Sequence, residues 1–229
     1  MQRIMDELFA EWRASELHRD CRIFVKDGII DPQLWKGAPV KIVFLLKEAN
    51  ESKTQGPEGD LAEWVRNGMR QRPKGKMWWN LSRWAYCILG LARGDDLDFP
   101  DHDGKPEVES VLGEALCSTA VVNIKKSDGG SSSNDEDLIH YITKDWRYLE
   151  RQLQIISPDI VVCGSTWHLV SAHLGQVERL RTHLYKTTRF YMVDFWHPSN
   201  RHAGDLDYFA LYGMVKSSRI LPTTPRTVP

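Results

Sequence analysis

The pattern of apolar and polar positions along the chain predicts strands that alternate with helices. Runs that are apolar at nearly every position are typical of strands buried on both faces, and they occur over residues 40–46, 119–126, 159–164 and 189–194. Apolar residues at helical spacing predict helices over residues 4–24, 61–69, 78–88, 107–116, 134–156, 165–175 and 203–217. This alternation favours an α/β fold, and we expect a three-layer sandwich around a central, mainly parallel, four-stranded sheet.

The longest predicted helix has the clearest boundaries. Asn134 is a good N-cap, and the acidic residues 135–137 suit the positive end of the helix dipole. Pro158 cannot continue the helix, which should end at residue 155 or 156. We expect its core face to consist of Leu138, Ile142, Leu149 and Leu153.

Length and composition indicate a single globular domain. The chain has 229 residues, of which 41% are hydrophobic and 27% charged, and we expect one domain over residues 1–221 with a disordered Pro/Thr-rich tail over 222–229. No apolar run approaches the ~20 residues that span a bilayer, and residues 1–7 lack the apolar core of a signal peptide. We therefore expect a monomeric, cytoplasmic protein with no membrane partner.

The sequence contains no motif that would hold a metal or a cofactor. The cysteines are widely spaced and form no CxxC pair, which favours buried, reduced thiols over a zinc or iron–sulfur site. The acidic residues 95–103 lack EF-hand spacing, and His168 and His173 are poorly spaced for one shared metal. P-loop, Gly-x-Ser-x-Gly and His-Glu-x-x-His motifs are absent, so we expect no cofactor.

A basic segment with interleaved tryptophans extends from residue 66 to residue 84. It contains Arg66, Arg70, Arg72, Lys74, Lys76 and Arg83 without an acidic residue between them, together with Trp78, Trp79 and Trp84. Basic groups neutralise phosphates and aromatic rings stack on bases, so this segment could contact a polyanion. The alternative is a basic loop that leads into a helix with a buried face of Trp78, Leu81, Ala85 and Ile88, and the two interpretations are compatible. Because the net charge is −1, any contact with nucleic acid must be local.

Polar side chains follow three of the predicted strands. Glu48 and Asn50 come after the first, Asn123 lies near the end of the second, and His197 follows the last. In open α/β sheets, ligands bind beyond the carboxyl ends of the strands. We therefore expect these side chains to converge at one edge of the sheet.

In this order, the segments resemble three motifs of the uracil-DNA glycosylase superfamily, across roughly residues 40–202. Residues 47–51, Lys-Glu-Ala-Asn-Glu, look like the first motif, written Gly-Glu-Ala-Pro-Gly or Gly-Gln-Asp-Pro-Tyr in relatives. Residues 123–126 are similar to the middle motif, Asn-x-x-Lys, and residues 197–199 to the third, His-Pro-Ser. Residues 157–164 also resemble a strand of this family. The resemblance implies a glycosylase-like α/β fold and excision of a base from DNA.

The resemblance also implies a role for each strand end. A base in a duplex must be flipped out before its glycosidic bond can be cleaved. Glu48 is the candidate for stabilising the sugar cation and for orienting or deprotonating the attacking water, and we place Asn50 beside it among the catalytic residues. His197 is the candidate donor to the carbonyl of the leaving base. Asn123 carries a donor and an acceptor on one amide, so it can complement uracil or cytosine.

DNA is the partner that the resemblance implies, and it would associate the protein with the nucleoid. The candidates for contact with DNA are Lys125, Lys126, Ser199, Asn200, Arg201, His202, Arg72, Lys74 and Lys76. In relatives, a bulky residue near the third motif fills the vacated base stack. Here Trp196, Asn200 and Arg201 are the alternatives for that role.

The first motif departs from that of its relatives. Lys47 and Asn50 replace glycine and proline, and Lys47, beside the base pocket, either contacts a phosphate or forms a Schiff base that adds strand cleavage. Glu51 stands where strict uracil enzymes carry a tyrosine that excludes thymine. We hypothesise that Glu51, in the base pocket, admits a polar C5 substituent, such as that of hydroxymethylated or glucosylated cytosine in phage DNA, and that the protein serves antiviral defence. Release of uracil alone from duplexes carrying each base would reject this hypothesis.

Three alternatives remain open at the level of the sequence. The first is a uracil-DNA glycosylase of base-excision repair, and the second is a relative that binds DNA without catalysis. The third is a different α/β hydrolase that acts on free nucleotides.

Overall fold

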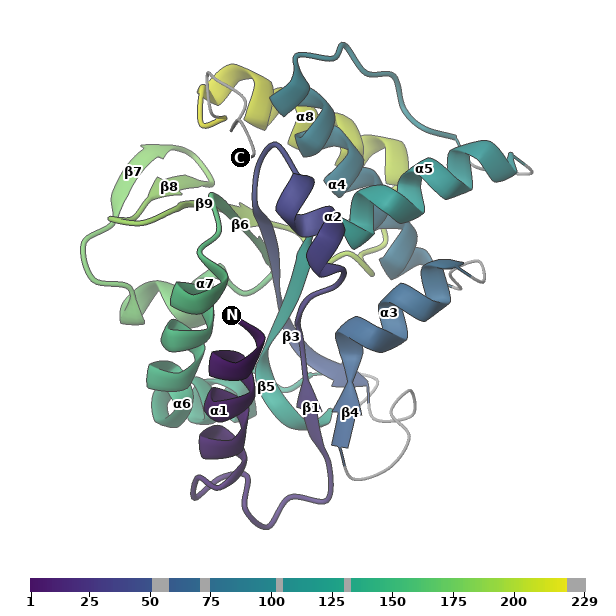
Figure 1. The fold of residues 1–229 in the computed structure, drawn as a ribbon. Helices are drawn as coiled ribbons and strands as arrows, with labels where there is room; N and C mark the ends of the chain where they lie inside the picture. The colour runs from purple at the N-terminus through teal and green to yellow at the C-terminus, as the bar shows by residue number, and fades with distance from the viewer. Residues whose placement is uncertain (51–57, 71–74, 102–104, 130–132, 222–229) are drawn as a thin grey trace.

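The computed structural model describes residues 1–50, 58–70, 75–101, 105–129 and 133–221, which form an α/β fold (Figure 1). The helices in these residues are α1 (Gln2–Arg13), α2 (Pro32–Gly37), α3 (Leu61–Arg70), α4 (Lys76–Arg93), α5 (Pro106–Cys117), α6 (Asp135–Ile156), α7 (Trp167–Val170) and α8 (Gly204–Ser218), with a 3₁₀ turn at Ser171–His173. The strands are β1 (Phe24–Lys26), β2 (Gly28–Ile29), β3 (Ile42–Asn50), β4 (Glu58–Asp60), β5 (Ala120–Gly129), β6 (Ile160–Gly164), β7 (Glu178–Arg181), β8 (Leu184–Lys186) and β9 (Tyr191–Phe195).

The described strands form one mixed sheet of nine strands. Its order is β4-β1-β5-β3-β6-β9-β8-β7, and β2 pairs with β5 outside this path. The pairs β3–β5, β3–β6 and β6–β9 are parallel, whereas β8 is antiparallel to β9, and both β1 and β2 are antiparallel to β5. The predicted α/β class is confirmed, and the sheet is larger and more mixed than the four strands that the sequence predicts.

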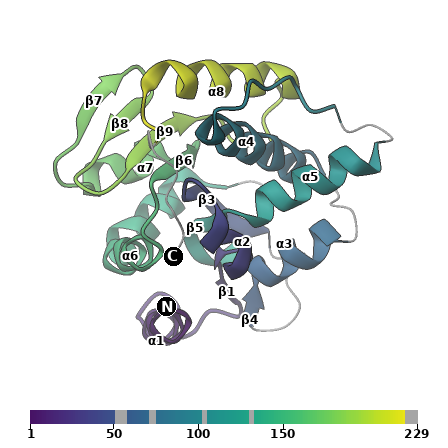
Figure 2. The same cartoon turned by 45° about the horizontal axis from the view of Figure 1, so that its top comes forward.

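Helices cover both faces of the sheet (Figure 2). On one face, α3, α4, α5 and α8 pack against side chains such as Phe44 and Val162. On the other, α1, α6 and α7 pack against Val43, Leu45 and Val161. All five of these strand residues are completely buried. The apolar run of β3 is therefore buried on both faces, as its composition predicts.

Two of the predicted helices are confirmed with their core faces. Asn134 accepts a hydrogen bond from the N–H of Glu136 (2.9 Å), so it caps α6, and the four residues predicted to face the core from α6 are buried. In α4, the predicted core face of Trp78, Leu81, Ala85 and Ile88 is buried. These helices are long and strongly patterned, which is the situation in which periodicity is most informative.

The helix predicted over residues 4–24 is too long. α1 ends at Arg13, and the chain turns before it enters β1 at Phe24. The guanidinium of Arg13 donates to the main-chain carbonyls of His18 and Cys21, which holds the turn in place. The apolar spacing alone does not reveal this turn, because the groups that stabilise it are a side-chain guanidinium and main-chain carbonyls.

The helix predicted after β6 is also shorter than expected. α7 covers only Trp167–Val170 and is followed by the 3₁₀ turn. Thr166 occupies the N-cap position of α7, and its hydroxyl donates to the carbonyl of Leu45 in β3 (2.9 Å). This hydrogen bond joins the start of α7 to the sheet.

Candidate active site

The three predicted catalytic segments leave the same edge of the sheet. The register pairs Leu46 of β3 with Asn123 of β5, and the parallel pairs β3–β6 and β6–β9 bring the carboxyl end of β9 to that edge. Glu48 lies two residues beyond Leu46, and His197 lies two residues beyond Phe195, the last residue of β9. The register therefore brings the three segments to one edge of the sheet. The predicted strand ends are wrong, however, because β3 and β5 are longer than the sequence predicts: Glu48 and Asn50 lie within β3, and Asn123 lies within β5.

Gly164 brings the segment after β9 close to the end of β3. A Cβ atom at Gly164 would lie 2.6 Å from Cδ2 of Leu46 and 3.2 Å from Cδ of Pro198, both shorter than ordinary carbon contacts. The absence of a side chain thus allows Leu46 and Pro198 to approach each other across the carboxyl end of β6. Because Pro198 directly follows His197, this glycine helps to determine where the imidazole lies. Nothing in the local sequence marks Gly164 as a site residue.

Glu48 is a shielded carboxylate within β3. Its side chain is 6% exposed, and Oε2 lies 3.6 Å from Nζ of Lys125, the residue opposite it in β5. Close packing with β5 continues at Gly129, where a Cβ atom would overlap the main-chain carbonyl of Ala49. A charge held in such a dry position interacts more strongly with a developing cation than it would in water.

Asn123 has a buried side-chain amide whose N–H donor is not used within the described residues. The residue is 2% exposed, and Nδ2 has no hydrogen-bond partner within the described part of the chain. Leaving such a donor unpaired costs about 1–3 kcal/mol. A ligand that offers a carbonyl oxygen or a ring nitrogen to Nδ2 would recover this free energy.

The hydrogen bonding of His197 defines its tautomer. The main-chain N–H of Ser199 donates to Nδ1 of His197 (3.1 Å), so the proton of the neutral ring must be on Nε2. Burial lowers the pKa of His197 below its usual value of 6.5, and the positive charge of Lys47 lowers it further. At neutral pH, His197 is thus an uncharged imidazole with an N–H donor at Nε2.

The loop that follows His197 is anchored to α4. Asn80 of α4 donates to the carbonyl of Pro198 (2.8 Å), and Lys76 donates to the carbonyls of Asn200 (2.8 Å) and His202 (2.6 Å). Lys76, predicted to contact DNA, therefore helps to hold this loop and remains exposed. Asn80 was not identified from the sequence, because its position within a helix gives no sign of a tertiary partner.

Two of the predicted DNA-contacting residues of this loop are engaged within the protein. Asn200 donates from Nδ2 to the buried Asp207 of α8 (2.7 Å) and accepts at Oδ1 from the N–H of His202 (2.8 Å). His202 also lies 3.1 Å from Asp207 through Nδ1. Asn200 is therefore a poor candidate to fill a vacated base stack, because leaving this position would break both hydrogen bonds.

The remaining polar loop residues face outward. Ser199 and Arg201 are exposed. Trp196 is 41% exposed, and its ring packs edge-on against His202 with ring centroids 4.6 Å apart. Of the three alternatives for filling the base stack, Trp196 and Arg201 have the exposure that this role requires.

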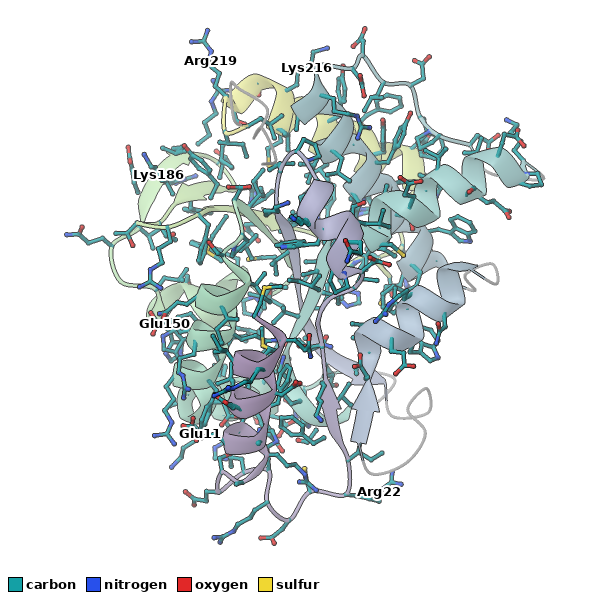
Figure 3. The ribbon with its side chains drawn as sticks, viewed as in Figure 1. Glu11, Arg22, Glu150, Lys186, Lys216 and Arg219 are labelled. Atoms are coloured by element: carbon teal, nitrogen blue, oxygen red, sulfur yellow. The ribbon has the colours of Figure 1, made fainter. Side chains whose placement is uncertain are left out.

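Lys125 and Lys126 do not lie in the position that the sequence analysis expects. Both side chains of the Lys126–Asp27 pair are completely buried, with Nζ 2.6 Å from Oδ1, and burial lowers the pKa of Lys126 despite this partner. Nζ of Lys125 lies 2.6 Å from Asp137, and although burial acts against it, the hydrogen bond to Asp137 raises the pKa of Lys125. Charged residues that do reach solvent, such as the labelled Arg22 and Lys186, lie at the outside of the molecule (Figure 3). We therefore do not retain Lys126 as a phosphate contact, and Lys125 is ion-paired with Asp137, which is partly exposed, and with Glu48.

Lys47 lies at the side of the site nearest α6 and α7. Its Nζ is 2.7 Å from Oδ1 of Asp135, the first residue of α6, and the other oxygen of Asp135 lies 3.1 Å from Nε2 of His168. Lys47 is therefore ion-paired, and its charge acts on His197 without direct contact between them being required. Asp135 is a further residue that the sequence analysis identified only as part of a helix N-terminus.

Several predicted site residues cannot be placed. Glu51, Arg72 and Lys74 lie outside the described residues, as does the tail over 222–229. The backbone of Asn50 ends β3 opposite Gly129, and its side chain also lies outside the described part of the structure.

The described residues contain no group of three or more His, Cys, Asp or Glu side chains that would hold a metal ion. All four cysteines lie in the described part of the chain and form no disulfide. Cys87, Cys117 and Cys163 are buried, and burial raises the pKa of Cys87 and Cys163 to about 12. None of the described helices has the length and apolar character needed to cross a membrane.

The segments that the register brings to one edge of the sheet carry three chemical groups: a shielded carboxylate, a buried amide and a neutral imidazole. A carboxylate can stabilise a cation or activate water, while amide and imidazole donors can bind a polar base edge and stabilise an anion. The sequence matches no protein-family model and no curated protein. The chemistry of these three groups is therefore the basis for assigning a function.

Proposed function

We propose that this protein is a DNA glycosylase that flips out a modified or damaged pyrimidine and hydrolyses its N-glycosidic bond to leave an abasic site. The observation that supports the proposal is the strand register, which sets the segments of Glu48 and Asn123 side by side and brings the carboxyl end of β9, two residues before His197, to the same edge of the sheet. We also assign the fold to a divergent member of the uracil-DNA glycosylase superfamily. The parallel pairing of β5, β3, β6 and β9, together with the order of the three motifs, supports this assignment.

Cleavage of the bond separates charge, and Glu48 is suited to the positive side. The sugar develops oxocarbenium character while the bond breaks, and a nearby carboxylate stabilises that charge. The same carboxylate can orient or deprotonate the water that attacks the sugar. The low exposure of Glu48 strengthens the electrostatic part of this role.

The leaving base takes the negative charge, and His197 is suited to stabilise it. A neutral imidazole that donates from Nε2 can hydrogen-bond to a base carbonyl as its charge develops, without first having to transfer a proton. Asn123 can bind the polar edge of the extruded pyrimidine through its unpaired Nδ2. The two residues therefore divide leaving-group stabilisation and base recognition between them.

Contact with DNA would be local and centred on the loop after His197. Ser199 and Arg201 are exposed there, and the exposed Lys76 lies against the same loop. We propose that a monomer of the protein acts on intracellular DNA in this way, with Trp196 or Arg201 entering the vacated stack. The candidate substrate is a C5-modified cytosine, hydroxymethylated or glucosylated, of phage DNA in antiviral defence, with uracil in repair as the alternative substrate.

The proposal is tested with duplexes that carry uracil, hydroxymethylcytosine, glucosylated hydroxymethylcytosine or unmodified cytosine at one position. Abasic sites are scored by alkaline cleavage for the wild type, for Glu48→Gln and for the control Glu150→Gln, which changes an exposed carboxylate on α6. We expect abasic sites on at least one modified duplex, with Glu48→Gln at least about 100-fold slower and the control unchanged. Absence of abasic sites on every duplex, or release of products only from free nucleotides, would overturn the proposal.

A further inference from the structure

The strand that carries Asn123 lacks a main-chain neighbour on one side at that residue. On this side of β5, the described pairing joins β2 to Ala120 and Val121 and resumes with β1 at Ser127. Asp27 is the residue between β1 and β2. The peptide groups of Asn123 therefore lie where the antiparallel pairing is interrupted.

A buried ion pair takes the place of the missing main-chain partner. Asp27 accepts the N–H of Asn123 at Oδ2 (2.8 Å), and Lys126 donates from Nζ to the carbonyl of Asn123 (2.8 Å). The same Nζ donates to Oδ1 of Asp27 (2.6 Å). The pair thus holds the peptide groups on both sides of the Asn123 Cα atom.

Asp27 is itself fixed from the side of α6. Gln152 donates from Nε2 to both Oδ1 (2.8 Å) and the main-chain carbonyl (3.2 Å) of Asp27. Lys126 is held by Trp12 of α1, because its Nζ lies over the indole ring, 4.9 Å from the ring centroid. Three hydrogen bonds to the carboxylate of Asp27, two from Lys126 and one cation–π contact, with the Lys126–Asp27 bond common to both counts, leave the pair little freedom to move.

Stability alone is a poor explanation for this pair. Removing two charges from water is costly, and well-packed apolar residues in place of a buried ion pair are often neutral or stabilising. What apolar residues would not supply is a donor and an acceptor matched to the peptide groups of Asn123. Those peptide groups set the direction of the Cα–Cβ bond, and so the direction in which the unpaired amide points.

We propose that Asp27 and Lys126 are positioning residues for Asn123, and that they thereby determine how strongly the protein recognises the extruded base. This inference rests on the proposed function, because it assumes that Asn123 binds the base. It assigns to Lys126 a role in base recognition through Asn123, in place of the phosphate contact expected from the sequence. It also adds Asp27, which the sequence marks only as part of a turn.

Base-dependent binding provides the test. Two probes are used: a duplex whose target pyrimidine carries a 2′-fluoro sugar that resists cleavage, and the same duplex with a tetrahydrofuran abasic analogue. The dissociation constant for the abasic duplex is divided by that for the duplex with the base. This ratio isolates recognition of the base from contacts with the DNA backbone. The variants are Asn123→Ala, Lys126→Met and Asp27→Asn, together with the double variant Asn123→Ala/Lys126→Met. Thr119→Val is the matched control, because Thr119 is also completely buried and its hydroxyl donates to the carbonyl of Leu116 (2.7 Å), a buried hydrogen bond that involves neither Asp27 nor Lys126.

We expect each of the three single variants to lower the ratio by about tenfold, as for the loss of one buried hydrogen bond. Affinity for the abasic duplex should stay within about threefold, and the control should keep the wild-type ratio. The decisive result is non-additivity: Lys126→Met should cause no further loss when Asn123 is already alanine. A purely structural effect of Lys126 would instead lower both affinities, or would persist in the double variant.

Several outcomes would overturn the inference. Folded Lys126→Met and Asp27→Asn variants that keep the wild-type ratio would do so, as would additive losses. If Lys126→Met does not fold, the charge-free variant Asp27→Leu/Lys126→Met replaces it, and failure of all these variants to fold would show that the pair serves folding. A wild type that forms no abasic sites would instead refute the proposed function itself, which separates the two failures.

Discussion

Replacing Gly164 by alanine should separate the two segments that approach each other across the end of β6. The substitution adds one methyl group, and the backbone of Gly164 does not have a positive φ angle, so alanine is compatible with the main chain. The added carbon would lie 2.6 Å from Leu46 and 3.2 Å from Pro198. With ordinary carbon contacts starting at about 3.5 Å, Leu46 must move by about 1 Å and Pro198 by about 0.3 Å.

These displacements predict two effects of different origin. Overpacking a closely packed core by one methyl group costs about 1–3 kcal/mol, which corresponds to a fall in Tm of about 2–12 °C for a chain of this size. Movement of Pro198 also carries His197 away from the end of β3. Because misplacement of a catalytic group by about 1 Å can cost about 100-fold, and Pro198 moves by about a third of that distance, we expect kcat to fall by about three- to fivefold.

The assay combines thermal unfolding with single-turnover base release, measured well below the Tm of the variant. Gly213→Ala is the control, because a Cβ atom there meets nothing within 4 Å and the residue lies within α8. Alanine in that helix should stabilise the protein by about 0.5–1 kcal/mol and leave activity unchanged. A Gly164→Ala variant with wild-type Tm and wild-type rate would refute the packing described for this edge of the sheet.

Three further predictions address separate parts of the structure. Lys47→Met removes a charge that helps to hold the pKa of His197 below 6.5, so the pH at which activity is lost on acidification should move upward. Lys47→Arg should return the pH–rate profile to that of the wild type, whereas an unchanged profile for Lys47→Met would contradict this prediction. Asn134→Ala should lower the free energy of unfolding by about 1 kcal/mol in denaturant titrations, through loss of the α6 cap, with no change in kcat. Arg201→Ala should weaken binding to all duplexes and reduce the salt dependence of log Kd by about one phosphate contact, whereas an unchanged slope would remove Arg201 from the interface.

The parts of the fold that the sequence predicts are those with strong local patterns. β3 and α6 have long apolar runs or a well-marked cap, and both are found close to the predicted positions. The short strands β1, β2, β4, β7 and β8 have two to four residues each, too few for an alternating pattern to show. They become strands because they pair with neighbours far away in the sequence, which no local pattern reports.

The candidate site shows the same division. The residue types at the strand ends, and the edge that they share, follow from the alternation of strands and helices. The sequence could not distinguish the two adjacent lysines of β5 from surface residues, because their acidic partners are supplied by Asp27 and by α6. In the same way, the importance of Gly164 depends on Leu46 and Pro198, which are distant from it along the chain.

The central claim is that Glu48, Asn123 and His197 act on one extruded pyrimidine. The most direct test is single-turnover release of the free base from a modified duplex, identified by mass spectrometry, for the wild type and for Glu48→Gln, Asn123→Ala and His197→Ala. We predict one free base for each abasic site formed by the wild type, with release at least about 100-fold slower in Glu48→Gln and at least about tenfold slower in the other two. Release of the base at wild-type rates by all three folded variants, or no release by the wild type from any duplex, would contradict the claim.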